Sequence, residues 1–218
     1  LPRRGVVELC APPGRGKLTE LGLAICRSAQ RERSEGELGF APSPEAFRSG
    51  LASGLASGLA SSGPAWCAWI DPAGTLYAPG VAERGVALSR LLVVRPPPEE
   101  AARVAVRLVA SGVFAAVVVD RASLPGAASS GPPARWRLAV RRLALACEQH
   151  ACTIALLTEV EAARHEALPT RMRLEVSRRY DDALRVHLVK ERRGRLAPPF
   201  TVPLSELNDH HPLVGSLA

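Results

Sequence analysis

The sequence lacks any apolar run long enough to cross a membrane, since none approaches the roughly 20 residues that a helical span needs. Its first residues, LPRRGVVELC, contain no long apolar segment, so we expect no secretory signal. Aromatic residues make up only 4% of the chain, and aliphatic side chains are therefore expected to build the core. These absences favour a globular cytoplasmic protein without a membrane partner.

Cysteine is scarce and scattered, with five residues and no C-x-x-C pair. This pattern predicts free thiols in a reducing compartment rather than a disulfide framework. The segment CEQHAC brings Cys147, His150 and Cys152 close together. Three local ligands without a second cluster make a poor metal site. We therefore interpret the segment as a helix-to-strand junction with buried thiols, with a metal site as the alternative.

Acidic residues are too few to balance the basic ones, which leaves a net charge of +7. Residues 171–195 carry nine lysines and arginines against four acids. A basic segment of this kind favours a polyanionic partner, such as single-stranded DNA bound without sequence preference. The alternative is a solvent-exposed, arginine-rich surface. The candidate contacts are Lys190, Arg192, Arg193 and Arg195.

Strands and helices alternate along most of the chain, and two antiparallel strands follow them. Apolar runs predict buried strands at 5–10, 65–71, 91–94, 114–120 and 152–157. Helical periodicity or capping residues predict helices from Lys17, at 96–112 and at about 134–150. Alternation in RMRLEVSRR and LRVHLVK predicts a hairpin that turns at Asp181–Asp182, with a last short strand at 200–204.

The expected fold class is therefore α/β, with a mainly parallel sheet flanked by helices and an antiparallel C-terminal hairpin. A single domain is expected over 1–204, followed by a C-terminal tail at 205–218. Within the domain, residues 50–63 repeat the unit G-L-A-S. Such low complexity predicts an adaptable insertion.

The stretch APPGRGKL, residues 11–18, is similar to a phosphate-binding loop, which reads Gly, four residues, Gly-Lys and then Ser or Thr. Ala11 stands at the first glycine and Leu18 at the Ser/Thr position. Leucine has no oxygen for Mg²⁺, and Thr19 lies about 100° further around the helix. We expect a site that binds ATP and magnesium only weakly. Its residues are Gly14, Arg15, Gly16, Lys17, Leu18 and Thr19.

Asp120 ends the apolar strand FAAVVVD. An acid at this place in nucleotide-binding proteins helps to hold magnesium. Asp120 is therefore a second candidate for nucleotide binding and the one candidate magnesium ligand. The alternative is a polar residue at the point where a strand leaves the core.

Several phrases together resemble the RecA recombinase core. Residues 68–123, which begin AWIDPAG and end FAAVVVDRAS, are similar to the family's central segment, in which a strand ends in Ile-Asp-Ala-Glu and ALVRSGAVDVIVVDSVAAL follows. VKERRGRLAPPF, residues 189–200, is similar to the family's VKNKIAAPF. The phrases occur in the same order and extend from the phosphate loop to about residue 204. The resemblance implies a RecA-like P-loop core.

The resemblance also implies where catalytic groups should stand. The family's catalytic glutamate falls on Ala73, and its magnesium-ligating threonine falls on Leu18. We therefore expect no catalytic residue and a chain that is not an efficient enzyme. The family's sensor glutamine corresponds to Glu159, and its DNA-binding loops correspond to 121–133 and to a shortened segment at 160–170. Basic residues near 190 reach a neighbouring protomer's nucleotide in that family, which is an alternative to DNA contact.

This degenerate pattern is similar to the ImuA group of RecA-like proteins, some of which are labelled SulA-like. The resemblance implies an accessory of SOS-induced translesion synthesis, associated with the nucleoid, that binds RecA, an ImuB-like polymerase subunit, or both. A DNA-stimulated ATPase of the recombinase-paralogue class is the alternative, and it would need Asp71 or Glu159 as a substitute base. Inhibition of cell division is a weaker alternative that rests on the shared label alone.

Overall fold

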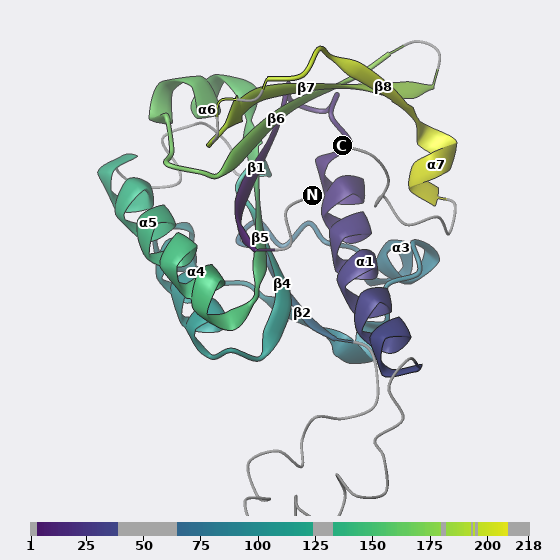
Figure 1. Ribbon diagram of the computed structural model, residues 1–218, viewed down its shortest axis with the longest axis vertical. Coiled ribbons are helices and arrows are strands. Elements are labelled where there is room, and N and C mark those ends of the chain that lie inside the picture. The colour runs from purple at the N-terminus through teal and green to yellow at the C-terminus, as the bar shows by residue number, and fades with distance from the viewer. Residues whose placement is uncertain are drawn as a thin grey trace, which may run out of the picture.

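A mixed sheet of eight strands forms the centre of the described part of the chain (Figure 1). The computed structural model describes residues 4–38, 65–123, 133–179, 182–192, 194 and 196–208. The strands are β1 (Gly5–Ala11), β2 (Trp66–Ile70), β3 (Leu91–Val94), β4 (Phe114–Asp120), β5 (Thr153–Glu159), β6 (Met172–Arg178), β7 (Ala183–Glu191) and β8 (Phe200–Pro203). Their order across the sheet is β3-β2-β4-β5-β1-β6-β7-β8.

The strands from β3 to β6 run parallel, whereas β7 and β8 continue the sheet in antiparallel pairing. The predicted α/β class, with its mainly parallel sheet and antiparallel C-terminal hairpin, is thereby confirmed. In the register, Ala11 pairs with Glu159, and Asp120 pairs with Leu157. The carboxyl ends of β1, β4 and β5 therefore meet at one edge of the sheet.

Helices cover both faces of the sheet (Figure 1). On one side lie α1 (Leu18–Leu38), α3 (Ala78–Glu83) and α7 (Leu204–Asn208), and on the other lie α4 (Ala101–Ala110), α5 (Pro133–His150) and α6 (Val160–Glu166). Single 3-10 turns occupy Leu88–Arg90 and Pro98–Glu100. None of the helices in the described ranges is long and apolar enough to span a bilayer.

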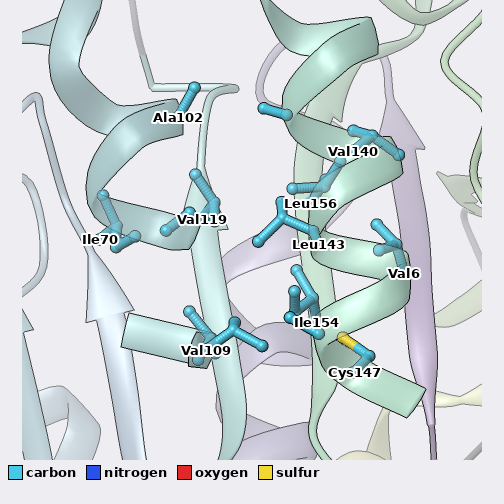
Figure 2. Close-up of a cluster of buried hydrophobic side chains, with 14 of the residues drawn as sticks. Val6, Ile70, Ala102, Val109, Val119, Val140, Leu143, Cys147, Ile154 and Leu156 are labelled. Atoms are coloured by element: carbon cyan, nitrogen blue, oxygen red, sulfur yellow. The ribbon is translucent and has the colours of Figure 1, made fainter. Parts of the chain in front are cut away.

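The larger apolar cluster lies between the sheet and helices α4 and α5 (Figure 2). Leu143 and Cys147 of α5 face Ile154 and Leu156 of β5 in this cluster. A second cluster, on the α1 side, includes Trp69 together with aliphatic residues of β1, β4 and β5. Both faces of β1, β2, β4 and β5 are covered, and their sequences are accordingly mostly apolar. The prediction of a buried strand at 91–94 is wrong in its burial, because β3 lies at the edge of the sheet and leaves Leu92 and Val93 exposed.

Two segments differ from their predicted conformation or boundary. Residues 160–170, expected as a shortened loop, carry helix α6 from Val160 to Glu166. The helix ends at Ala167, which adopts a left-handed conformation with φ 44°. Helix α7 begins at Leu204 and contacts the core through Leu204 and Leu207, so it spans the expected boundary between domain and tail. The repeat at 50–63, Asp181 and most of the loop 121–133 lie outside the described residues.

The five cysteines are all buried and free, as predicted. Helix α5 ends at His150 and β5 begins at Thr153, so Cys147 and Cys152 flank a helix-to-strand junction. The interpretation of CEQHAC as a junction with buried thiols is confirmed. Over the described ranges, no group of three or more His, Cys, Asp or Glu side chains has an arrangement that could hold a metal ion.

Candidate functional site

The predicted phosphate loop, residues 11–18 and called the phosphate loop below, connects the end of β1 to the start of α1. Its turn is closed by a hydrogen bond of 3.1 Å from the amide of Arg15 to the carbonyl of Pro12. The amide of Arg178, at the end of β6, donates to the carbonyl of Arg15 at 2.9 Å and ties the loop to the sheet. Gly14 has φ 68°, a conformation that favours glycine. The strand, loop and helix follow in the order that the sequence predicts.

Ala11 and Gly16 approach each other closely across the loop. A Cβ atom on Gly16 would lie 1.8 Å from the Cβ of Ala11, which no pair of real atoms tolerates. Ala11 itself has a negative φ, as its place in β1 requires. The chain therefore accommodates alanine at the first glycine position because position 16 carries no side chain.

Backbone donors of the loop are available to a ligand. Within the described residues, the amides of Gly14, Gly16 and Lys17 donate no hydrogen bond. They lie at the N-terminus of α1, a helix of 21 residues, where the aligned peptide dipoles favour negative charge. This arrangement suits the oxygens of a phosphate group.

Lys17 is paired within the chain. Its Nζ lies 2.6 Å from Oε1 of Glu20, and the guanidinium of Arg84 lies 3.3 Å from the same oxygen. All three side chains are partly exposed. Sequence reasoning missed Glu20 and Arg84: the spacing of Lys17 and Glu20 was a usable signal, but nothing in the sequence places Arg84 beside them.

Leu18 and Thr19 follow the prediction made from their spacing. Leu18 is half-buried and packs against the α1-side cluster, so it offers nothing to a metal. Thr19 is exposed on α1, one position further around the helix, and does not replace the missing hydroxyl. Arg15 is exposed at the tip of the loop.

Asp120 is buried, and its carboxylate is hydrogen-bonded to the segment that follows β4. Its two carboxylate oxygens accept hydrogen bonds from the amide of Ser123 at 3.1 Å and from the Ser123 hydroxyl at 2.6 Å. Burial raises the pKa of Asp120 above its usual value, and the bonds from Ser123 offset this only in part. Each oxygen keeps one further lone pair that could accept from a metal-bound water, and a metal role for Asp120 stays a prediction.

Asp71 is fully buried at the end of β2. Its carboxylate accepts bonds of 3.0 Å from the amides of Thr75 and Leu76, and Arg95 approaches it at 3.4 Å. The hydroxyl of Thr75 lies 3.4 Å from Asp71 and 3.3 Å from the hydroxyl of Ser123. The two acids are thus joined through Thr75 and Ser123, and these four residues are called the acid region below.

Ala73 lies in the tight turn after β2. The amide of Gly74 donates to the carbonyl of Asp71 at 3.2 Å, and Gly74 has φ 71°. The methyl group of Ala73 is exposed and carries no function that could polarise a water molecule. Glu159, at the end of β5, is half-buried, and its carboxylate makes no hydrogen bond or ion pair with the described residues.

Two of the four basic candidates near β7 contact other residues of the protein. Lys190 donates to the carbonyl of Leu168 at 2.7 Å, and burial lowers its pKa. Arg192 lies 3.7 Å from Glu148 of α5, and both side chains are exposed. Arg193 and Arg195 lie outside the described residues. A DNA or interface role for these four residues stays a prediction.

A cavity of about 500 Å³ lies beside Pro12 and Pro13 of the phosphate loop, between α6 and strands β6 and β7. Its lining includes Cys10, Glu175 and His187, which neighbour one another across three strands. Burial raises the pKa of the Cys10 thiol well above its ordinary value. A thiol with a raised pKa is a poor nucleophile, so the row is not a catalytic arrangement.

Two buried ion pairs lie beneath α6, and sequence reasoning missed both. Arg173 of β6 donates to Glu8 of β1 at 2.8 Å, and Arg121 donates to Glu166 of α6 at 2.8 Å. The Arg121 guanidinium also lies 4.3 Å from the centre of the Trp136 ring. The Arg121–Glu166 pair fixes α6 at the end of β4, and the Arg173–Glu8 pair joins β6 to β1. The one available signal was a glutamate inside the apolar strand GVVELCA.

Comparison with known proteins adds no relative: no family model matches the chain, and no curated protein matches it.

Proposed function

We propose that this chain is a RecA-like core protein whose site binds ATP without hydrolysing it efficiently. The observation that carries the proposal is the contrast between the phosphate loop and its missing partners. Free amides and Lys17 stand at the N-terminus of α1, whereas Leu18 and Ala73 stand where a hydroxyl and a glutamate are needed. Phosphoryl transfer needs a positioned metal and a positioned water, and these two residues supply neither.

The placement of the resembling phrases supports a RecA-like core. IDPAG ends β2 and forms the turn after it, AAVVVD lies in β4, and VKERRGRLAPPF extends from β7 into β8. The first two of these phrases bring Asp71 and Asp120 to the edge of the sheet at which the phosphate loop begins. A nucleotide on the loop would lie at this edge, which is where ligands bind in open α/β sheets.

Within this proposal, the protein is a nucleoid-associated accessory of SOS-induced translesion synthesis. It acts by binding RecA, an ImuB-like polymerase subunit, or both, with nonspecific contacts to single-stranded DNA through the basic segment. The support is the resemblance of the sequence to the ImuA group. The degenerate site agrees with it, because a protein that works by association needs no turnover.

Two measurements test the proposal. ATP binding is expected to be weak and to be lost in Lys17→Ala, and hydrolysis is expected to stay at background with or without single-stranded DNA. Turnover at a recombinase-like rate that Lys17→Ala abolishes would overturn the non-hydrolysing site. A pull-down with RecA and ImuB, with and without ATP, tests the accessory role, which fails if neither partner is retained.

A DNA-stimulated ATPase is the second candidate, and the free carboxylate of Glu159 favours it. Glu159 pairs with Ala11 in the sheet and so stands next to the phosphate loop. Asp71, the other acid considered, already accepts bonds from Thr75 and Leu76. If turnover exists, Glu159→Gln should remove it, and an unchanged rate would leave this candidate without a base.

A further inference from the structure

We infer that the Glu20 carboxylate competes with a bound phosphate for Lys17. We also infer that Arg84, which pairs with Glu20, is a second phosphate-binding residue. This inference rests on the proposed function, because it concerns the occupancy of the same loop. It assigns the site a ligand class: a polyphosphate tail bound by two side-chain cations without a metal ion.

The geometry begins with one oxygen atom that two cations share. Oε1 of Glu20 lies 2.6 Å from Nζ of Lys17 and 3.3 Å from the guanidinium of Arg84. The two cations are therefore within about 6 Å of each other, a separation at which one phosphate group contacts both. Lys17 and Glu20 are three residues apart, so both lie at the start of α1 beside the free loop amides.

Arg84 is held in place from the opposite side. It follows the last residue of α3, and its carbonyl accepts a hydrogen bond of 3.3 Å from Arg27 of α1. The next residue, Gly85, has φ 73° and ends the helix. The backbone of Arg84 is thus fixed against α1, and only its side chain needs to turn from Glu20 to a ligand.

A ligand that binds here has to displace a carboxylate. The cluster holds two positive charges and one negative charge, and a phosphate that takes over the cations leaves Glu20 unpaired nearby. Like charges at this distance repel, so Glu20 lowers the affinity for every anion. A tripolyphosphate tail carries several charges and overcomes this better than a single phosphate does. Arg84 also neutralises charge that a metal would otherwise neutralise, and Leu18 provides no ligand for that metal.

The test uses isothermal titration calorimetry with ATP and with inorganic tripolyphosphate, in EDTA. Glu20→Gln is expected to bind tripolyphosphate about tenfold more tightly than the wild type, since one competing charge is removed. Adding Arg84→Gln to this variant should reverse most of the gain. The matched control is Glu100→Gln, which breaks an ion pair of the same spacing with Arg103 on α4 and should leave affinity unchanged.

The outcomes separate the inference from the proposed function. Equal affinity of wild type and Glu20→Gln, with binding still abolished by Lys17→Gln, would overturn the inference alone. No binding of ATP or tripolyphosphate by any variant would overturn the proposed function. The Lys17–Glu20 pair can also be tested without a ligand, by acetylating Lys17 with acetic anhydride and following the product by mass spectrometry. Glu20→Gln should raise the acetylation rate of Lys17, and an unchanged rate would reject the pairing.

Discussion

The phosphate loop and the acid region lie at one edge of the sheet and differ in what they leave free. In the loop, the amides of three residues have no acceptor among the described residues, and beside it two cations share one carboxylate. In the acid region, every carboxylate oxygen of Asp71 and Asp120 already has a donor. The difference teaches that donors for an anion and carboxylates for a metal lie on separate elements, so that one set can stay free while the other is engaged.

The largest expected effect comes from removing the carboxylate of Asp71. Asp71→Ala removes a fully buried carboxylate and with it three hydrogen-bond or ion-pair contacts, which should cost about 3 kcal/mol of unfolding free energy. Urea denaturation measures it. Asp71→Asn, which keeps one oxygen, is the control and should cost less. A loss under 1 kcal/mol in Asp71→Ala would mean that the acid region is not a structural network.

In the phosphate loop, we expect stability to depend on steric fit rather than on a buried carboxylate. Gly16→Ala places a methyl group against Ala11, and such overpacking should cost about 2 kcal/mol and weaken ATP binding. Ala11→Gly removes the clash, so the double variant should regain most of the stability. The comparison of the two single variants with the double variant measures the coupling. Additive effects would show that the two positions do not meet.

A smaller effect in the acid region is expected from pH. Burial raises the pKa of Asp120 in the folded protein, so its protonated form is favoured there. Its contribution to stability is complete below the pKa of the unfolded chain, about 3.9, and is lost as pH rises through the folded value. The unfolding free energy of the wild type, relative to Asp120→Asn, should therefore fall as the pH rises above about 4. A constant difference would contradict the raised pKa.

The smallest effect is expected at Ala73, because its side chain is exposed. Ala73→Glu should change stability by no more than about 0.5 kcal/mol. It should also leave ATP hydrolysis at background, since Leu18 still supplies no hydroxyl for a metal ion. Circular dichroism melting and a phosphate-release assay check both statements. Turnover in Ala73→Glu alone would show that the acid region still serves chemistry.

Sequence patterns predicted the elements whose burial is uniform. Strands β4 and β5 are covered on both faces, so their apolar runs gave their positions to within two residues. Helix α3 contains Pro79 and Gly80 and has no apolar period, so no local signal predicted it. Helix α6 was missed because the resemblance to a family with a loop at this place outweighed its own helix-favouring residues, such as Ala162 and Ala163.

The candidate site was predictable where it is local. The loop residues, Asp120 and the absent hydroxyl at Leu18 follow from spacing along the chain. The engagement of Asp71 by Arg95, and of Glu20 by Arg84, depends on how β2, β3 and α3 fold onto the loop. Contacts of this kind join residues far apart in sequence, and no pattern within a single segment encodes them.

Lys17 adopts φ 50°, a left-handed conformation that residues with a Cβ atom rarely take. This costs about 1 kcal/mol relative to an ordinary backbone, and glycine or asparagine would take the same conformation with less strain. Either would fold into a more stable protein without the ammonium group of Lys17. The molecule is therefore less stable than its own fold permits, and the deficit lies at the residue on which the proposed phosphate binding would depend.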